Sequence, residues 1–97
     1  MTAGSLLDEL WRVITDRFAN PKEGSYVSGL VNGGKGADRA LEKVGEEATE
    51  FIIAVKNGEH QHIVSEAADL QFHLLIALKA AGVEFNEVLD ELGRRRR

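Results

Sequence analysis

Four stretches of the chain carry apolar residues at every third or fourth position, the spacing that places them on one face of an α-helix. This pattern predicts helices over residues 5–20, 38–56, 59–81 and 84–92. No alternating run of apolar and polar residues is long enough to indicate a β-sheet. The hydrophobic pattern therefore predicts an all-α fold.

Local signals mark the ends of these predicted helices. Ser5 and Asp38 suit the N-cap position of the first two helices, because their side-chain oxygens accept hydrogen bonds from free backbone N–H groups. Asn57-Gly58 favours the left-handed backbone that ends a helix, and Gly82 follows the third helix. We therefore expect the second and third helices to form an antiparallel hairpin.

The segment between the first two helices, residues 21–36, differs from its surroundings in composition. Its glycine density disfavours regular structure and predicts a mobile loop. The two interpretations of this loop are a flap that closes over a phosphorylated substrate and a flexible connector. Its glycines are Gly24, Gly29, Gly33, Gly34 and Gly36, and its hydrogen-bond donors are Lys22, Ser25, Tyr26, Ser28 and Lys35.

The second half of the third predicted helix is apolar on nearly all sides. A chain of 97 residues buries only about 60–70% of its unfolded surface, so one copy cannot cover such a helix. We predict a homodimer in which helical hairpins form a four-helix-bundle-like core across a twofold axis, or a larger assembly of such dimers. The apolar residues are Leu70, Phe72, Leu74, Leu75, Ile76, Ala77, Leu78, Ala80 and Ala81.

Composition narrows the classes of protein that fit. Sixteen acidic residues against twelve basic ones give a net charge of −4, which argues against nucleic acid as a partner. The absence of cysteine excludes a disulfide framework and thiol chemistry, and it fits a cytoplasmic location. No apolar run reaches membrane-spanning length, and the first residues lack the pattern of a signal peptide. We expect one domain, residues 1–97, with no membrane contact.

Three further features have simple interpretations. His60 and His62 point to different sides of a helix start and are interpreted as surface residues. Arg94–Arg97 are interpreted as a solvated basic tail, with contact to an anionic ligand as the alternative. Gly45 interrupts the second helix at a cost of about 1 kcal/mol relative to Ala, which indicates close approach of a ligand or another chain, or tight helix packing.

Two pairs of carboxylates flank the apolar stripes of the predicted hairpin. Glu47 and Glu50 lie on the second helix, and Glu66 and Asp69 lie on the third. Spacing by three residues places each pair on one helical face, with Cβ atoms roughly 5–6 Å apart. Charges about 4 Å apart repel by around 4 kcal/mol per pair at an effective dielectric constant of ~20, so convergence of both pairs would require a cation. Oxygen ligands favour Mg²⁺, Mn²⁺ or Ca²⁺, whereas the alternative is an ordinary solvated surface.

Other polar residues lie close to these acids in the sequence. Glu46 falls on another side of its helix and is a weaker candidate, either for a second ion or for positioning water. Lys43 lies four residues before Glu47, so it can reach the groove or form a simple ion pair. His73 lies four residues after Asp69 and either hydrogen-bonds to it or serves a structural role.

Two segments of the sequence resemble the phosphoribosyl-ATP pyrophosphohydrolases, a family of the MazG-like all-α nucleotide pyrophosphohydrolases with an E-E-x-x-E then E-x-x-D signature. The resemblance extends from Leu6 to Leu92 and includes Ser25-Tyr26-Val27-Ser28. One departure is Gln71-Phe72, where the family pattern has Leu-Tyr, and it leaves the acidic motif unchanged. The two segments are Lys43-Val44-Gly45-Glu46-Glu47-Ala48-Thr49-Glu50 and Glu66-Ala67-Ala68-Asp69-Leu70-Gln71-Phe72-His73-Leu74.

The resemblance implies Mg²⁺-dependent hydrolysis of phosphoribosyl-ATP to phosphoribosyl-AMP and pyrophosphate, the second step of histidine biosynthesis, with Mn²⁺ as the alternative ion. Two other functions stay open: a related enzyme acting on another NTP or dNTP, and a non-catalytic helical dimerisation module. The implied site comprises Glu47, Glu50, Glu66 and Asp69 as metal ligands, Glu46 as a catalytic residue, and Lys43, Lys35, Ser25, Tyr26 and His73 as substrate-binding residues.

Overall fold

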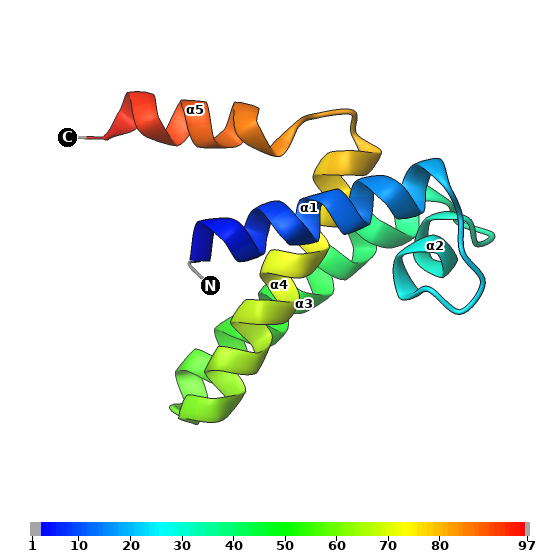
Figure 1. The fold of residues 1–97 in the computed structure, drawn as a ribbon. Helices are drawn as coiled ribbons and strands as arrows, with labels where there is room; N and C mark the ends of the chain where they lie inside the picture. The colour runs from blue at the N-terminus through cyan, green and yellow to red at the C-terminus, as the bar shows by residue number, and fades with distance from the viewer. Residues whose placement is uncertain (1–2, 97) are drawn as a thin grey trace.

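The computed structural model describes residues 3–96, which form five α-helices and no strand. The prediction of an all-α fold is confirmed. In Figure 1, α3 and α4 form a long antiparallel hairpin, α1 crosses one half of it, α2 lies beside α3, and α5 extends away as an arm. No helix within residues 3–96 is long and apolar enough to cross a membrane. The helices are α1 (Ala3–Ala19), α2 (Tyr26–Val31), α3 (Ala37–Asn57), α4 (His60–Ala80) and α5 (Phe85–Arg95).

The α3–α4 hairpin is closed by the predicted glycine turn. Gly58 has φ +71° and ψ +21°, and its N–H bonds to the carbonyl oxygens of Ala54 and Val55 at 3.0 and 3.1 Å. This left-handed residue ends α3 and lets α4 begin two residues later, at His60. Gly82, with φ +75°, follows the C-cap of α4 in the same conformation. Both predicted stop signals are confirmed.

The predicted helix starts are less accurate. Because α1 begins at Ala3, Ser5 lies inside the helix and does not cap it. The N-cap of α3 is Gly36, so Asp38 lies within the first turn. Its negative charge there interacts favourably with the helix dipole. The predicted N-cap of α3 is therefore wrong by two positions, and Ser5 lies two positions after the first residue of α1.

The C-terminal helix is longer than predicted. Arg94 and Arg95 belong to α5, and both form ion pairs with Glu91 one turn earlier. Only Arg96 of the predicted tail follows the helix in the described part of the chain, since Arg97 lies outside it. Basic side chains in the last turn of a helix interact favourably with its dipole.

The segment 21–36 contains a helix, contrary to the prediction of an irregular loop. Ser25 caps α2: its Oγ accepts a hydrogen bond from the Ser28 N–H at 3.3 Å. Val27 and Leu30 of α2 are buried in the hydrophobic core. A cap and two buried side chains outweigh the glycine content over these six residues. The mobility of the segment stays a prediction.

The core lies where α1 crosses the hairpin. Ile14 of α1 and Leu75 and Ile76 of α4 are fully buried. The chain therefore covers more of the second half of α4 than the sequence predicted. A charge at Leu75 would disrupt the fold of one chain and would not report on dimerisation.

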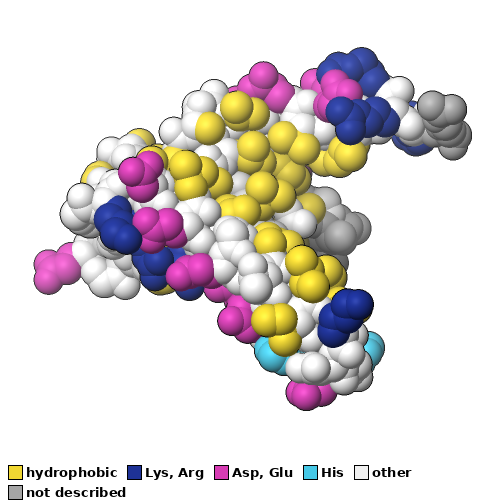
Figure 2. Space-filling view, turned by 180° about the vertical axis from the view of Figure 1, so that it is seen from behind, with side chains coloured by type: hydrophobic (Ala, Val, Ile, Leu, Met, Phe, Trp, Pro, Cys, Tyr) yellow, Lys and Arg dark blue, Asp and Glu magenta, His cyan; other side chains and the backbone are white. Residues whose placement is uncertain are grey.

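Apolar side chains of the hairpin remain exposed elsewhere. Leu41 and Ile52 belong to the apolar face of the predicted helix 38–56, but they are 57% and 58% exposed. The residues of α3 that the chain does bury are Ala40, Glu47 and Ala54. Figure 2 shows hydrophobic side chains in a band that reaches along the hairpin towards its tip. Part of the apolar face of α3 thus points outwards in a single chain.

Alanine at Gly45, within α3, and at Gly58, the C-cap of α3, should change stability in opposite directions. At Gly58 the positive φ makes Ala unfavourable, and we expect a loss of about 1 kcal/mol in unfolding free energy. At Gly45 an added Cβ would meet no described atom within 4 Å apart from its chain neighbours and the nearby backbone of its own helix, so Ala should stabilise the helix by about 0.5–1 kcal/mol. Urea unfolding measures both. A Gly45→Ala protein less stable than wild type would show that another chain packs against this backbone.

Candidate active site

The hairpin brings four of the five motif acids of α3 and α4 together, and we call these four the acid cluster: Glu47, Glu50, Glu66 and Asp69. Carboxylate oxygens of Glu47, Glu66 and Asp69 lie within 4.8 Å of one another. A second group, within the same limit, consists of Glu50, Glu66 and the imidazole of His62. Glu66 belongs to both groups and is therefore the centre of the cluster.

The environment of Glu66 fits a bound cation. Its side chain is 14% exposed, and its Oε2 is buried without a hydrogen-bond partner among the described residues. A buried carboxylate oxygen without a partner is unfavourable, because it has lost water and gained nothing in return. Contact with a hard cation such as Mg²⁺ would remove this penalty.

Protonation is the other way to relieve the repulsion between these acids. A proton lets Glu66 hydrogen-bond to Glu47, and this contact raises the pKa of Glu66, with further contributions from burial and from neighbouring charges. Burial opposes ionisation of Glu47, but hydrogen bonds from Glu66 and Lys43 outweigh it and lower the pKa of Glu47. Lys43 Nζ lies 3.3 Å from Glu47 Oε1. In the metal-free protein, Glu66 is therefore the acid of this pair that holds a proton to higher pH.

Because the pKa of Glu66 is raised, we expect Mg²⁺ affinity to fall as the pH is lowered from neutrality through that pKa. A cation needs the ionised form of Glu66, so binding must displace its proton. Below the raised pKa, each pH unit should weaken the affinity by up to about tenfold, and above it the affinity should level off. Isothermal titration calorimetry across this range measures the effect. A constant affinity would show that the cation does not displace this proton.

Tyr26 and His73, both predicted to contact substrate, contact each other. Nδ1 of the buried His73 lies 2.8 Å from the backbone oxygen of Asp69, which can only accept, so Nδ1 carries the hydrogen. With the ring hydrogen on Nδ1, Nε2 accepts a hydrogen bond from the Tyr26 hydroxyl at 2.7 Å. His73 thus hydrogen-bonds to the backbone of Asp69. The pair ties the start of α2 to α4 beside the acid cluster.

The basic residues before the acid cluster form an ion-pair network on the first half of α3. Arg39 Nη1 lies 3.2 Å from Glu42 Oε1 and 3.4 Å from Glu46 Oε2. Lys35 Nζ donates to both carboxylate oxygens of Glu42, at 3.1 and 3.0 Å. Lys43 Nζ lies 3.7 Å from Glu46 Oε2. Lys35 lowers the pKa of Glu42, which in turn raises the pKa of Arg39.

This network bears on the roles of two residues, Glu46 and Arg39. Glu46, the predicted catalytic residue, is exposed and contacts the basic side chains of Arg39 and Lys43, and it belongs to neither group of the acid cluster. Arg39 was missed from the sequence, although its place four residues before Lys43 puts both on one helical face. The catalytic role of Glu46 stays a prediction.

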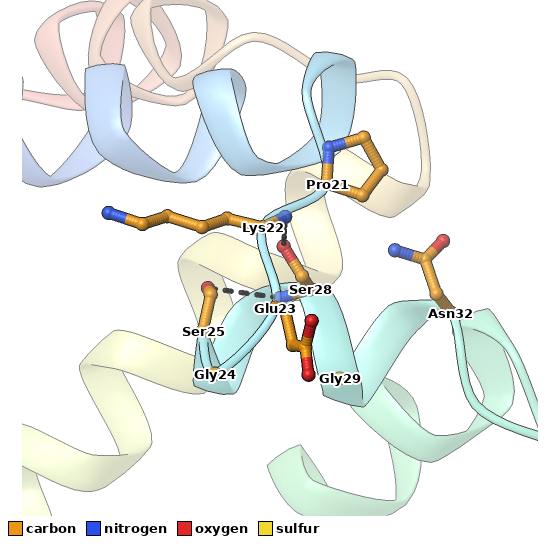
Figure 3. A pocket seen from close by; sticks show the side chains of 8 residues that line it. All are labelled: Pro21, Lys22, Glu23, Gly24, Ser25, Ser28, Gly29 and Asn32. Atoms are coloured by element: carbon orange, nitrogen blue, oxygen red, sulfur yellow. Dashed lines mark hydrogen bonds between the residues drawn. The ribbon is translucent and has the colours of Figure 1, made fainter.

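Ser25 lines a separate hollow of about 270 Å³ at the start of α2 (Figure 3). Its hydroxyl is occupied as the N-cap, and the neighbouring Ser28 Oγ accepts from the backbone N–H of Lys22 at 3.0 Å. The described residues around this hollow include no member of the acid cluster. The lining residues are Pro21, Lys22, Glu23, Gly24, Ser25, Ser28, Gly29 and Asn32.

His62 was interpreted as a surface residue, and the structure places it beside the acid cluster. Its side chain is half-buried, with Nε2 3.3 Å from Glu66 Oε1 and Nδ1 4.0 Å from Glu59 Oε2. The sequence did contain a signal, because His62 precedes Glu66 by four residues on one helix. The imidazole of His62 adds a nitrogen atom that could bind a metal ion to a cluster that otherwise offers only carboxylate oxygens.

Known proteins resemble this chain along nearly its whole length. Residues 7–96 match the sequence profile of the family described as phosphoribosyl-ATP pyrophosphohydrolase. A phosphoribosyl-ATP pyrophosphatase from Methanosphaerula palustris is 62% identical over 97 residues, which cover 100% of this chain and 98% of the relative. Proteins of the same name from Methanoculleus marisnigri and Methanocella arvoryzae are 55% and 53% identical. Their matches cover 96% and 95% of this chain, and 96% and 97% of the relatives.

Proposed function

This chain belongs to the phosphoribosyl-ATP pyrophosphohydrolase family, and we infer from its membership that it hydrolyses phosphoribosyl-ATP to phosphoribosyl-AMP and pyrophosphate. This reaction is the second step of histidine biosynthesis, and it adds water across the anhydride between the α- and β-phosphates. The observation that carries the proposal is the match to the family over residues 7–96, in a chain whose motif acids converge around Glu66. We place the reaction in the cytoplasm.

We assign Mg²⁺, with Mn²⁺ as the alternative, to Glu47, Glu50, Glu66 and Asp69. Support comes from the carboxylate donors, the partnerless Oε2 of Glu66 and the mutual repulsion that a cation would relieve. When bound, such an ion neutralises charge on the triphosphate and orients the attacking water. The protein's part is to hold the carboxylates in place on two helices that cannot slide apart without breaking the hairpin.

The positive charges of the site lie at one end of the acid cluster. Lys43 is half-buried and already contacts Glu47, so a small rotation would let its ammonium group contact a phosphate oxygen as well. Tyr26, whose ring is half exposed, and His73 set the position of α2 next to this groove. We assign Lys43 to substrate phosphate, and we assign Tyr26 and His73 to the edge of the substrate pocket. Glu46 is the candidate for positioning water, once the substrate draws away its basic partners.

We also propose that two chains associate through the outward faces of the hairpin. Exposed apolar residues on α3 and α4 support this arrangement, because contiguous apolar patches on the surface of a soluble protein mark interaction sites. These residues are Leu41, Ile52, Ile53, Val55, Val64 and Leu74.

A product assay tests the proposed reaction. The protein is incubated with Mg²⁺ and phosphoribosyl-ATP, ATP or dCTP, and the release of pyrophosphate is measured. We expect release from phosphoribosyl-ATP far faster than from the other two nucleotides. Rapid turnover of dCTP with none of phosphoribosyl-ATP would identify a different pyrophosphohydrolase. No pyrophosphate from any of them would favour a non-catalytic module.

A further inference from the structure

The substrate of the proposed reaction carries negative charge at two separate places. Its triphosphate is one, and the single phosphate of the phosphoribosyl group is the other, with a purine and two riboses between them. ATP has only the first. A second anion site at some distance from the acid cluster, formed by cations, would let an enzyme prefer phosphoribosyl-ATP to ATP.

The ion-pair network on α3 lies at such a distance. Arg39 precedes Glu47 by eight residues, so their backbones are separated by about 12 Å along the helix, and Arg39 precedes Lys43 by about 6 Å. Shared partners connect the two places: Glu46 contacts both Arg39 and Lys43, and Lys43 contacts Glu47. One face of α3 therefore connects the acid cluster, through Lys43, to Arg39 and its neighbour Lys35.

These cations are free to change partners. The side chain of Lys35 is 64% exposed and that of Arg39 is 40% exposed, as is that of their common partner Glu42. Ion pairs so open to solvent contribute only about 0–1 kcal/mol, so exchange of a carboxylate for a phosphate is inexpensive. A guanidinium group can hold a phosphate with two parallel hydrogen bonds, and an adjacent ammonium group adds a point charge.

The placement of Lys35 favours a ligand site over a helix-stabilising contact. It lies before α3, in the segment between α2 and α3, whereas Arg39 lies on α3 itself, so two parts of the chain direct cations to one carboxylate. We propose that Lys35 and Arg39 bind the phosphate of the phosphoribosyl group and thereby select phosphoribosyl-ATP over ATP. In the absence of substrate, Glu42 forms ion pairs with both cations. This inference rests on the proposed function.

The test compares three variants with wild type for hydrolysis of phosphoribosyl-ATP and of ATP, and for inhibition by ribose 5-phosphate. Arg39→Gln should lower kcat/KM for phosphoribosyl-ATP by about 10- to 100-fold, mainly through KM, and lower kcat/KM for ATP by much less. It should also weaken inhibition by ribose 5-phosphate. Arg12→Gln removes an exposed arginine of α1 and is the matched control. It should change neither the hydrolysis of the two nucleotides nor the inhibition by ribose 5-phosphate.

Glu42→Gln separates a ligand site from a structural network. It removes the anion that competes with phosphate, so ribose 5-phosphate should inhibit this variant more strongly than wild type. If the network only stabilised the helix, Glu42→Gln and Arg39→Gln would act in the same direction. Circular dichroism and thermal unfolding check that the variants fold.

Two outcomes would overturn the inference while the proposed function stands. One is wild-type selectivity in Arg39→Gln, and the other is an equal loss with phosphoribosyl-ATP and ATP, which would place Arg39 at the triphosphate. A wild-type protein that does not hydrolyse phosphoribosyl-ATP would instead remove the proposed function, and this inference with it.

Discussion

Replacement of Glu66 by Gln should abolish turnover and leave the metal-free fold at least as stable as the wild type. Glu66 is the member shared by both groups of the acid cluster, so its loss disrupts every proposed ligand set. Metal ions contribute several kcal/mol to reactions of this class, and the rate should therefore fall at least about 100-fold. The metal-free fold should not suffer, because the Gln amide can donate to Glu47 as protonated Glu66 does, and a repulsive charge is gone.

Thermal unfolding with and without Mg²⁺ completes this test. At a Mg²⁺ concentration of 100 times Kd the wild type should gain about 2.7 kcal/mol, and Glu66→Gln should gain much less. Glu9→Gln, an exposed acid of α1, serves as the control and should change neither activity nor the Mg²⁺ response. Glu50 belongs to only one group, so Glu50→Gln should have a smaller effect than Glu66→Gln. Full activity in Glu66→Gln would remove the acid cluster from the mechanism.

Ile52→Glu should separate the proposed dimer into monomers. Ile52 is 58% exposed in a single chain, so a charge there is harmless to the fold of one copy. In a dimer that covers this face, the same charge would lose its water without gaining a partner, which is strongly unfavourable. Light scattering coupled to gel filtration at micromolar concentration gives the mass, and circular dichroism gives the helix content.

A matched substitution adds the same charge outside the proposed interface. Gln61→Glu places it at the exposed tip of the hairpin, and this variant should keep the mass of the wild type. A wild-type protein that is monomeric at these concentrations, or an Ile52→Glu protein of dimeric mass, would refute the proposed interface. Unfolding of Ile52→Glu without dissociation would show that the fold of one chain depends on this side chain.

Features governed by neighbours in sequence could be predicted. The hairpin turn follows from Gly58, and the convergence of Glu47 with Glu66 and Asp69 follows from helical spacing on two consecutive helices. These features depend on local backbone geometry, which the sequence expresses directly. Comparison with the family adds the substrate, which no spacing of acids could identify.

Features governed by tertiary contacts could not be predicted. The glycine content of residues 21–36 gave no indication of α2, because this helix is stabilised by the burial of Val27 and Leu30 in a core contributed by other helices. Tyr26 and His73 are 47 residues apart, so no local pattern indicates that they form a hydrogen bond. The stripe on α3 was recognised as apolar, but periodicity does not say whether one chain or its neighbour covers such a face.

The hairpin turn at Gly58 also has a consequence for the order of folding. All members of the acid cluster lie on two consecutive helices joined by this turn, so the site forms through contacts that are short in sequence and need little loop-closure entropy. Closure of the hairpin then brings the carboxylates together early, and their repulsion opposes the folding transition state. Mg²⁺, or the loss of charge in Glu66→Gln, should therefore accelerate refolding as well as slow unfolding. Stopped-flow refolding with and without Mg²⁺ would detect this acceleration.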